Sequence, residues 1–280
     1  MTWLLRNGRY ETEMSLQLLP DNYCRSLGID HSSIGIYRHL PAQCRIQGYF
    51  VKSRSAGAER KVAGRAGALS VAAVEGIVQE CGFSPDAAQV EQLTEYLSLV
   101  MKWNKVMNLI GPYSWEEALR TLIMDSLHLA RFLDTLSLPD APVCWDFGAG
   151  AGLPGIPLRV VWNRGTYHLV EVREKRALFM QQTVARLKIA NTQVFRGRAE
   201  DFMAAHEPAD ILLSRAFMPW EKLLEFAGGN IARTGRVVIL AIEDVPASLP
   251  EGWRLEARHD YAVGADTRYF WSLAPIMASN

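Results

Sequence analysis

Short apolar runs alternate with longer stretches of helical pattern in the C-terminal half of the chain. Val143–Phe147 and Tyr167–Glu171 are apolar runs of the kind that form buried parallel strands. Because strand and helix patterns follow one another, the sequence predicts a doubly wound parallel sheet. We expect strands near 143–147, 167–171, 192–196, 209–213 and 235–241, and helices near 154–163, 174–189 and 219–230.

The end of the chain departs from this alternation. Trp253–Arg258 and Thr267–Leu273 are β-rich runs, and the segment between them contains Gly264, Ala265 and Asp266. Two such runs around a glycine-containing turn predict an antiparallel hairpin that completes the sheet.

Residues 70–137 have a helical pattern instead. Val90, Leu93, Leu97 and Val100 recur at intervals of three and four residues, which places them on one helix face. In Ser84-Pro85-Asp86, the serine is expected to cap a helix and the proline to take its first position. We therefore predict a helical N-terminal subdomain over 68–138, followed by an α/β domain over 139–280.

Residues 1–67 have no sustained periodicity. They carry ten Lys/Arg against five Asp/Glu, although the whole chain of 280 residues has no net charge. A basic segment could attract the phosphates of a nucleic acid. We favour a basic, poorly ordered leader, since the segment lacks the apolar pattern of a packed core.

Composition excludes several classes of protein. The four cysteines form no CxxC pair, so neither a disulfide framework nor a metal site is indicated. No apolar run of about 18 residues is present, and the N-terminus lacks the order of a secretion signal. The sequence therefore predicts a cytoplasmic globular protein without metal or membrane contacts.

A glycine-rich turn follows the first predicted strand. Gly148, Gly150 and Gly152 allow the backbone to turn tightly and to lie against a ligand. Glu171 ends the next strand 23 residues after Gly148, where a ribose-binding carboxylate is expected. The segment Gly150-x-Gly152-x-x-Gly155 also matches the dinucleotide fingerprint, so the turn alone leaves the choice of nucleotide open.

Polar residues follow the other strands as well. Asp146 lies near the end of the first strand, Gly197–Glu200 follows the third and Ser214-Arg215 follows the fourth. The carboxyl ends of parallel strands share one edge, so these residues are expected to line one pocket. Spacing singles out no nucleophile or acid–base set there, which favours methyl transfer, a reaction that depends on positioning, over hydride transfer.

Six sequence blocks together resemble the RsmG (GidB) methyltransferase family. The blocks are Trp103-Asn-Lys-x-x-Asn-Leu109, Asp125-Ser126, Asp146-x-Gly-x-Gly-Ala-Gly-Leu-Pro-Gly-Ile-Pro157, Lys175-Arg176, Gly197-Arg-Ala-Glu200 and Ser214-Arg-Ala216. The resemblance implies a Rossmann-like, S-adenosylmethionine-dependent methyltransferase fold. It also implies methyl transfer to guanine N7 in 16S ribosomal RNA of the small ribosomal subunit.

The resemblance also implies roles for individual residues. The implied cofactor-binding residues are Gly148, Gly150, Gly152, Leu153, Glu171, Ala199, Glu200 and Arg215. Lys175 and Arg176 are implied RNA-binding residues, and Trp103, Asn104 and Asn108 are candidates for positioning the acceptor.

The chain departs from the family pattern at three positions. Thr121 and Leu122 stand where relatives commonly have Arg-His, and Ala241 lies where a lysine is common at the end of the fifth strand. Polar or basic groups near the expected RNA face are therefore absent. A small-molecule methyltransferase and a non-catalytic cofactor-binding module remain open as alternatives.

Overall fold

The computed structural model describes residues 4–6, 9–11, 67–112 and 114–276. The chain divides into two units, 1–49 and 50–280. In the first unit, β1 (Leu4–Arg6) pairs antiparallel with β2 (Arg9–Glu11). The rest of the predicted leader up to residue 66 lies outside the described residues, so its disorder stays a prediction.

The second unit contains a seven-stranded sheet with the order β5-β4-β3-β6-β7-β9-β8. Its first five strands are parallel, and β9 pairs antiparallel with both β7 and β8. The strands are β3 (Val143–Phe147), β4 (Thr166–Glu171), β5 (Thr192–Arg196), β6 (Ala209–Ser214), β7 (Ile231–Ala241), β8 (Trp253–Val263) and β9 (Asp266–Pro275). The prediction of a doubly wound α/β sheet completed by an antiparallel hairpin is confirmed.

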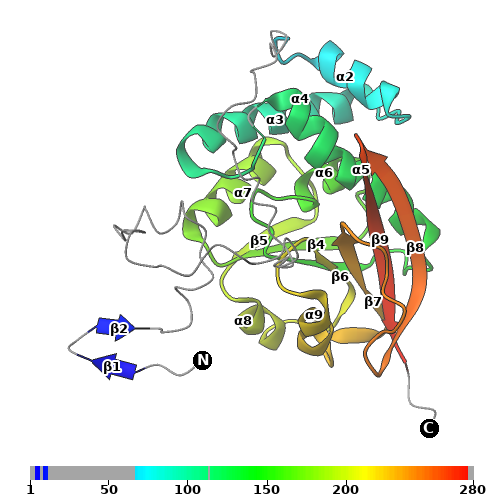
Figure 1. Ribbon diagram of the computed structural model, residues 1–280. Helices are drawn as coiled ribbons and strands as arrows, with labels where there is room; N and C mark the ends of the chain where they lie inside the picture. The colour runs from blue at the N-terminus through cyan, green and yellow to red at the C-terminus, as the bar shows by residue number, and fades with distance from the viewer. Residues whose placement is uncertain (1–3, 7–8, 12–66, 113, 277–280) are drawn as a thin grey trace, which may run out of the picture. The chain divides into compact units, whose positions relative to one another are not determined.

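Helices cover both faces of this sheet (Figure 1). Those that follow the parallel strands are α6 (Gly155–Val161), α7 (Glu174–Arg186), α8 (Ala199–Ala204) and α9 (Trp220–Ala227). The short helix α8 was not predicted, because six residues are too few to show a helical period. The prediction of a strand from residue 235 was also too short, since β7 begins at Ile231.

The N-terminal helices of the second unit precede the sheet in the chain. They are α2 (Val71–Glu80), α3 (Ala87–Met107), α4 (Trp115–Ala118), the π-helical turn η3 (Leu119–Ile123) and α5 (Met124–Thr135). Asp86, and not Ser84, caps α3. Its carboxylate accepts a hydrogen bond from the amide of Gln89 at 2.8 Å, and the Gln89 side chain accepts one from the amide of Asp86 at 2.9 Å. This reciprocal capping box satisfies two helix-end donors, which explains why the helix begins there.

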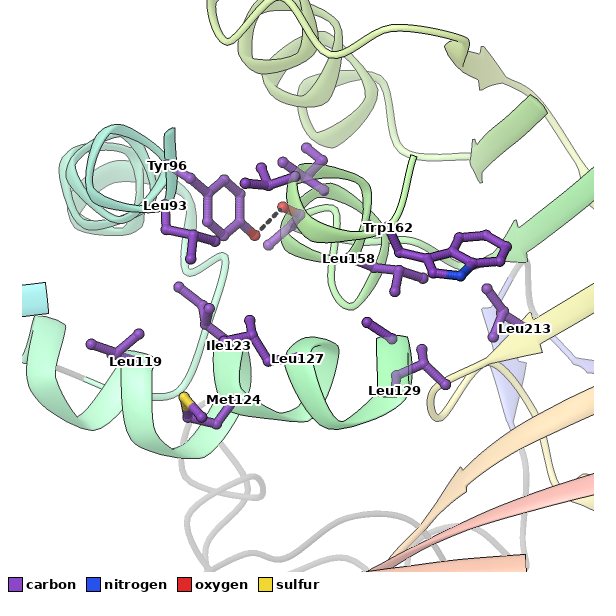
Figure 2. Packing of buried hydrophobic residues seen from close by; sticks show 14 of the residues in the cluster. Leu93, Tyr96, Leu119, Ile123, Met124, Leu127, Leu129, Leu158, Trp162 and Leu213 are labelled. Carbon is purple, nitrogen blue, oxygen red and sulfur yellow. Dashed lines mark hydrogen bonds between the residues drawn. The ribbon is translucent and has the colours of Figure 1, made fainter. Parts of the chain in front are cut away.

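Separate apolar cores lie on the two faces of the sheet. One contains Trp145, Phe147 and Phe202, with residues of α8 and α9. The other joins the N-terminal helices, α6 and α7 to the opposite face. Figure 2 shows part of this second core, where Leu93 of α3, Leu127 of α5 and Leu158 of α6 gather. The N-terminal helices therefore share a core with α6 and with Ala149 and Ala151 of the glycine-rich turn.

Candidate functional site

The turn between β3 and α6 has a backbone that favours glycine. Gly148, Gly150 and Gly152 have φ angles of +69°, +60° and +79°, which side chains rarely tolerate. A Cβ on Gly152 would also lie 2.4 Å from the Cδ1 of Ile156. The amide of Gly148 donates to the carbonyl of Val170 at 2.9 Å, which holds the turn against β4. These three glycines lie in the tight turn that the sequence predicts, and their left-handed backbone explains why glycine is needed there.

Glu171 lies at the end of β4, directly beside this turn. Its Oε2 accepts a hydrogen bond from the amide of Gly150 at 3.0 Å, and its Oε1 accepts one from the amide of Arg173 at 2.8 Å. Only 5% of the residue is exposed. Each carboxylate oxygen has a second lone pair, so Glu171 can brace the turn and still accept a hydrogen bond from a ligand hydroxyl.

Asp146 is almost fully buried beneath the turn. Burial raises the pKa of its carboxyl to about 7, although hydrogen bonds from the Tyr167 hydroxyl and the Gly155 amide act in the opposite direction. The Tyr167 hydroxyl lies 3.1 Å from Oδ2 of Asp146. A Cβ on Gly155 would lie 2.7 Å from the same oxygen, so glycine allows α6 to approach the strands closely. Asp146 therefore supports the turn from inside the protein.

The other residues predicted to bind the cofactor do not all lie at the glycine turn. Leu153 belongs to the turn, and its amide donates to the carbonyl of Ala149 at 3.1 Å. Ala199 is buried at the start of α8, whereas Glu200 is exposed and forms an ion pair with Arg198 at 3.0 Å. The glycines, Leu153 and Glu171 are thus joined by hydrogen bonds in and around one turn. Ala199 and Glu200 lie beyond the end of the neighbouring strand, β5.

Arg215, which follows β6, takes part in a cluster around the buried Asp125 that the sequence did not predict. Asp125 lies 3.6 Å from its guanidinium, forms an ion pair with Arg268 and accepts a hydrogen bond from the Tyr261 hydroxyl at 2.8 Å. Burial raises the pKa of Asp125, although the charges of Arg215 and Arg268 act to lower it. Asp125 and Arg215 each lie in a block that resembles the family, whereas Tyr261 and Arg268 lie far away in the sequence and outside those blocks.

A groove of about 400 Å³ brings together two segments predicted to face RNA. Its lining consists of Val106, Met107 and Asn108 at the end of α3, and of Arg173, Glu174, Lys175 and Arg176 at the start of α7. Arg176 also borders the glycine turn, because its Nη1 lies 3.6 Å from the place of a Cβ on Gly150. The groove and the candidate cofactor turn are therefore neighbours.

The three acceptor-positioning candidates also make contacts within the protein. Asn108 ends α3 in the left-handed conformation, with φ of 49°. The Asn104 side chain accepts a hydrogen bond from the amide of Ile110 at 2.9 Å and so shapes the following loop. Trp103 packs edge-on against Phe179 of α7, with ring centroids 5.9 Å apart. These contacts explain the fold of the segment, and its role toward RNA stays a prediction.

The departures from the family pattern lie on two elements. Thr121 and Leu122 belong to the π-helical turn η3, a type of turn that often occurs at functional sites. The guanidinium of Arg268 donates to the carbonyl of Thr121 at 2.6 Å, so a basic group does lie beside this position. Ala241 ends β7 and is followed by Ile242, which is 70% exposed.

Two further observations concern metals and membranes. Among the described residues, no group of three or more His, Cys, Asp or Glu side chains is arranged to hold a metal ion. Within the same part of the chain, no helix has both the length and the apolar character needed to cross a bilayer.

A glycine turn after the first strand and an antiparallel strand inserted near the sheet edge define a Rossmann-like fold of the methyltransferase type. The family described as "rRNA small subunit methyltransferase G" (GidB) matches residues 89–245. The chain belongs to this family.

Two relatives that are more than 50% identical agree with this membership. The "Ribosomal RNA small subunit methyltransferase G" of Nitratidesulfovibrio vulgaris (strain DP4) is 54% identical over 202 residues, covering 72% of this chain and 93% of that protein. The protein of the same name from Oleidesulfovibrio alaskensis is 51% identical over 211 residues, covering 72% and 92%. A solved structure, "Putative methyltransferase yhhF from Escherichia coli", is 18% identical with a TM-score of 0.45, covering 56% of this chain and 89% of that one.

Proposed function

We propose that the protein transfers a methyl group from S-adenosylmethionine to guanine N7 of 16S ribosomal RNA in the small ribosomal subunit. The observation that carries this proposal is the close relationship to proteins named ribosomal RNA small subunit methyltransferase G, at up to 54% identity. A ribosomal substrate also agrees with the cytoplasmic location that the sequence predicts.

The residues of the turn suit this cofactor. The left-handed glycines give the tight turn against which such a ligand would lie, and the Glu171 carboxylate retains lone pairs for the ribose hydroxyls. Ala199 and Glu200, beyond the next strand, are assigned to the adenine, and Leu153 to the wall of the pocket. Arg215 is assigned to the edge of the site, where its guanidinium lies 3.6 Å from Asp125.

The chemistry requires little from the protein besides positioning. S-adenosylmethionine supplies a methyl carbon that is electrophilic because it is bonded to a sulfonium. The N7 atom of guanine has a free lone pair, so no base is needed to generate the nucleophile. Holding two reactants in line can supply roughly 7–11 kcal/mol of the barrier reduction. The protein therefore acts mainly by fixing the guanine against the cofactor.

The groove between α3 and α7 is the part of the site that we assign to RNA. Arg173, Lys175 and Arg176 outnumber the one acid in its lining, Glu174. Such basic side chains gain affinity for RNA by neutralising phosphates. Arg176 also borders the glycine turn, so RNA bound there would lie next to the cofactor. Trp103, Asn104 and Asn108, at the end of α3, are assigned to the framing of the acceptor.

Methyl transfer can be measured directly. Purified small subunits from cells that lack the gene are incubated with the protein and S-adenosylmethionine labelled on its methyl group, in parallel with free nucleosides and a pool of small metabolites. We expect label in 16S RNA alone. Label in a small molecule would instead identify a small-molecule methyltransferase. Cofactor binding without transfer to any acceptor would identify a non-catalytic module.

A further inference from the structure

Tyr96 connects the helical part of the protein to the glycine turn. It lies in the middle of α3 and is fully buried. Its hydroxyl donates a hydrogen bond to the carbonyl of Ala151 at 2.9 Å. Figure 2 shows this bond as the dashed line from Tyr96, which points away from its own helix toward the neighbouring segment. A residue of the N-terminal helices thus reaches the backbone at the centre of the turn.

The turn is held from two sides. From the sheet, Glu171 accepts the hydrogen bond of the Gly150 amide. From α3, Tyr96 donates to the carbonyl of the next residue, Ala151. The peptide that joins Ala151 to Gly152 is fixed at its other end too, because the Gly152 amide donates to the carbonyl of Ala149 at 2.7 Å. Tyr96 and Glu171 therefore fix the two peptide groups that flank the Gly150–Ala151 peptide, in a glycine segment that is intrinsically flexible.

We propose that Tyr96 is a positioning residue, which holds the glycine turn in the conformation that binds the cofactor. The inference rests on the proposed function, since it takes S-adenosylmethionine as the ligand of the turn. Tyr96 does not need to touch the cofactor. It acts through the Ala151 carbonyl. Without the Tyr96 hydroxyl, S-adenosylmethionine has to order the turn as it binds, and the cost of that ordering lowers the binding affinity.

Helix α3, which carries Tyr96, also reaches the RNA side of the site. The last residues of the same helix, Met107 among them, line the groove that we assign to RNA. The helix is thus in contact with both parts of the site. Because the Tyr96 hydroxyl bonds the turn and Tyr96 does not line the groove, loss of this hydroxyl should affect the cofactor and leave the binding of RNA to the free enzyme unchanged.

The test uses Tyr96→Phe, which removes one hydroxyl and keeps the ring that packs in the core. Thr183→Val is the matched control. The Thr183 hydroxyl is also buried and bonds a backbone carbonyl, that of Phe179 at 2.8 Å, but within α7 and away from the turn. Unfolding in urea, calorimetric binding of S-adenosylmethionine and steady-state methylation of small subunits are measured for both variants and the wild type.

We expect both variants to lose some stability, because each loses one buried hydrogen bond. Only Tyr96→Phe should raise the dissociation constant and the KM for S-adenosylmethionine, by about fivefold to tenfold. Its KM for the small subunit should stay within twofold of the wild-type value. An unchanged cofactor affinity in Tyr96→Phe, or an equal loss in Thr183→Val, would overturn the positioning role. If the wild type itself does not bind S-adenosylmethionine, the proposed function fails.

Discussion

Replacing Glu171 by glutamine tests whether one carboxylate both braces the glycine turn and binds the cofactor. The side chain keeps its size, but one of its two acceptor oxygens becomes an NH2 group. Since the two oxygens accept from the amides of Gly150 and Arg173, one of these N–H groups would then face another donor. The residue is only 5% exposed, so water can replace the lost partner only poorly.

The expected loss can be estimated from these contacts. A hydrogen bond to a charged group contributes about 1.5–3 kcal/mol, so the free energy of unfolding of Glu171→Gln should fall by roughly that amount. The ribose hydroxyls would lose their charged acceptor at the same time. A loss of this size corresponds to roughly a tenfold to hundredfold rise in the dissociation constant of S-adenosylmethionine. Urea unfolding and calorimetry measure the two quantities separately.

Glu80→Gln provides the control for this prediction. It makes the same chemical change at an exposed ion pair with Arg120, which should contribute about 0–1 kcal/mol. If Glu171→Gln is as stable as Glu80→Gln, the hydrogen bonds of Glu171 to the turn contribute little to the stability of the fold. If it loses stability but binds S-adenosylmethionine like the wild type, Glu171 supports the turn and the proposed contact with the cofactor is refuted.

Three further predictions follow from packing, burial and charge. Gly155→Ala should lower the free energy of unfolding by about 1–3 kcal/mol, because its Cβ would lie within 2.8 Å of three buried side chains. Gly76→Ala, where a Cβ meets nothing within 4 Å, should raise the free energy of unfolding by about 0.5–1 kcal/mol. If both alanine variants change the free energy of unfolding in urea by the same amount, the close packing at Gly155 is contradicted. The stability of the wild type relative to Asp146→Asn should fall as the pH rises from about 4 to about 7, since the folded state retains a proton that the unfolded chain releases. The slope should be roughly 1.4 kcal/mol per pH unit, and a flat profile across the same window would mean that the carboxylate is already ionised in the folded state. Replacing Lys175 and Arg176 by alanine should reduce the slope of log affinity for RNA against log salt by roughly 1.4–1.8, and an unchanged slope would place RNA elsewhere.

The parts of the site that depend on local sequence could be predicted. The glycine turn and Glu171 follow from apolar runs that end at polar residues, since parallel strands bring such ends to one edge. The structure places Gly150 and Glu171 within hydrogen-bonding distance, as this reasoning requires. Their role in cofactor binding stays a prediction.

Contacts between distant segments could not be predicted in this way. Asp125 meets Tyr261 and Arg268, which lie 136 and 143 residues later in the chain, and no periodicity connects them. Tyr96 reads as one more apolar position on α3, and its hydroxyl gives no sign of the carbonyl that it bonds. Ser84-Pro85 matches a common helix start, so the sequence predicts Ser84 as the cap of α3, whereas Asp86 caps it in the structure.

The most direct test of the proposed function is to map N7-methylguanine in 16S ribosomal RNA from cells with and without the gene. Chemical cleavage at N7-methylguanine, read by primer extension, locates the modified nucleotide. We predict one site that disappears when the gene is deleted, returns when the wild-type gene is restored, and is depleted when only Glu171→Ala is supplied. An identical set of N7-methylguanines in both strains would contradict the assignment of this protein as a 16S ribosomal RNA methyltransferase.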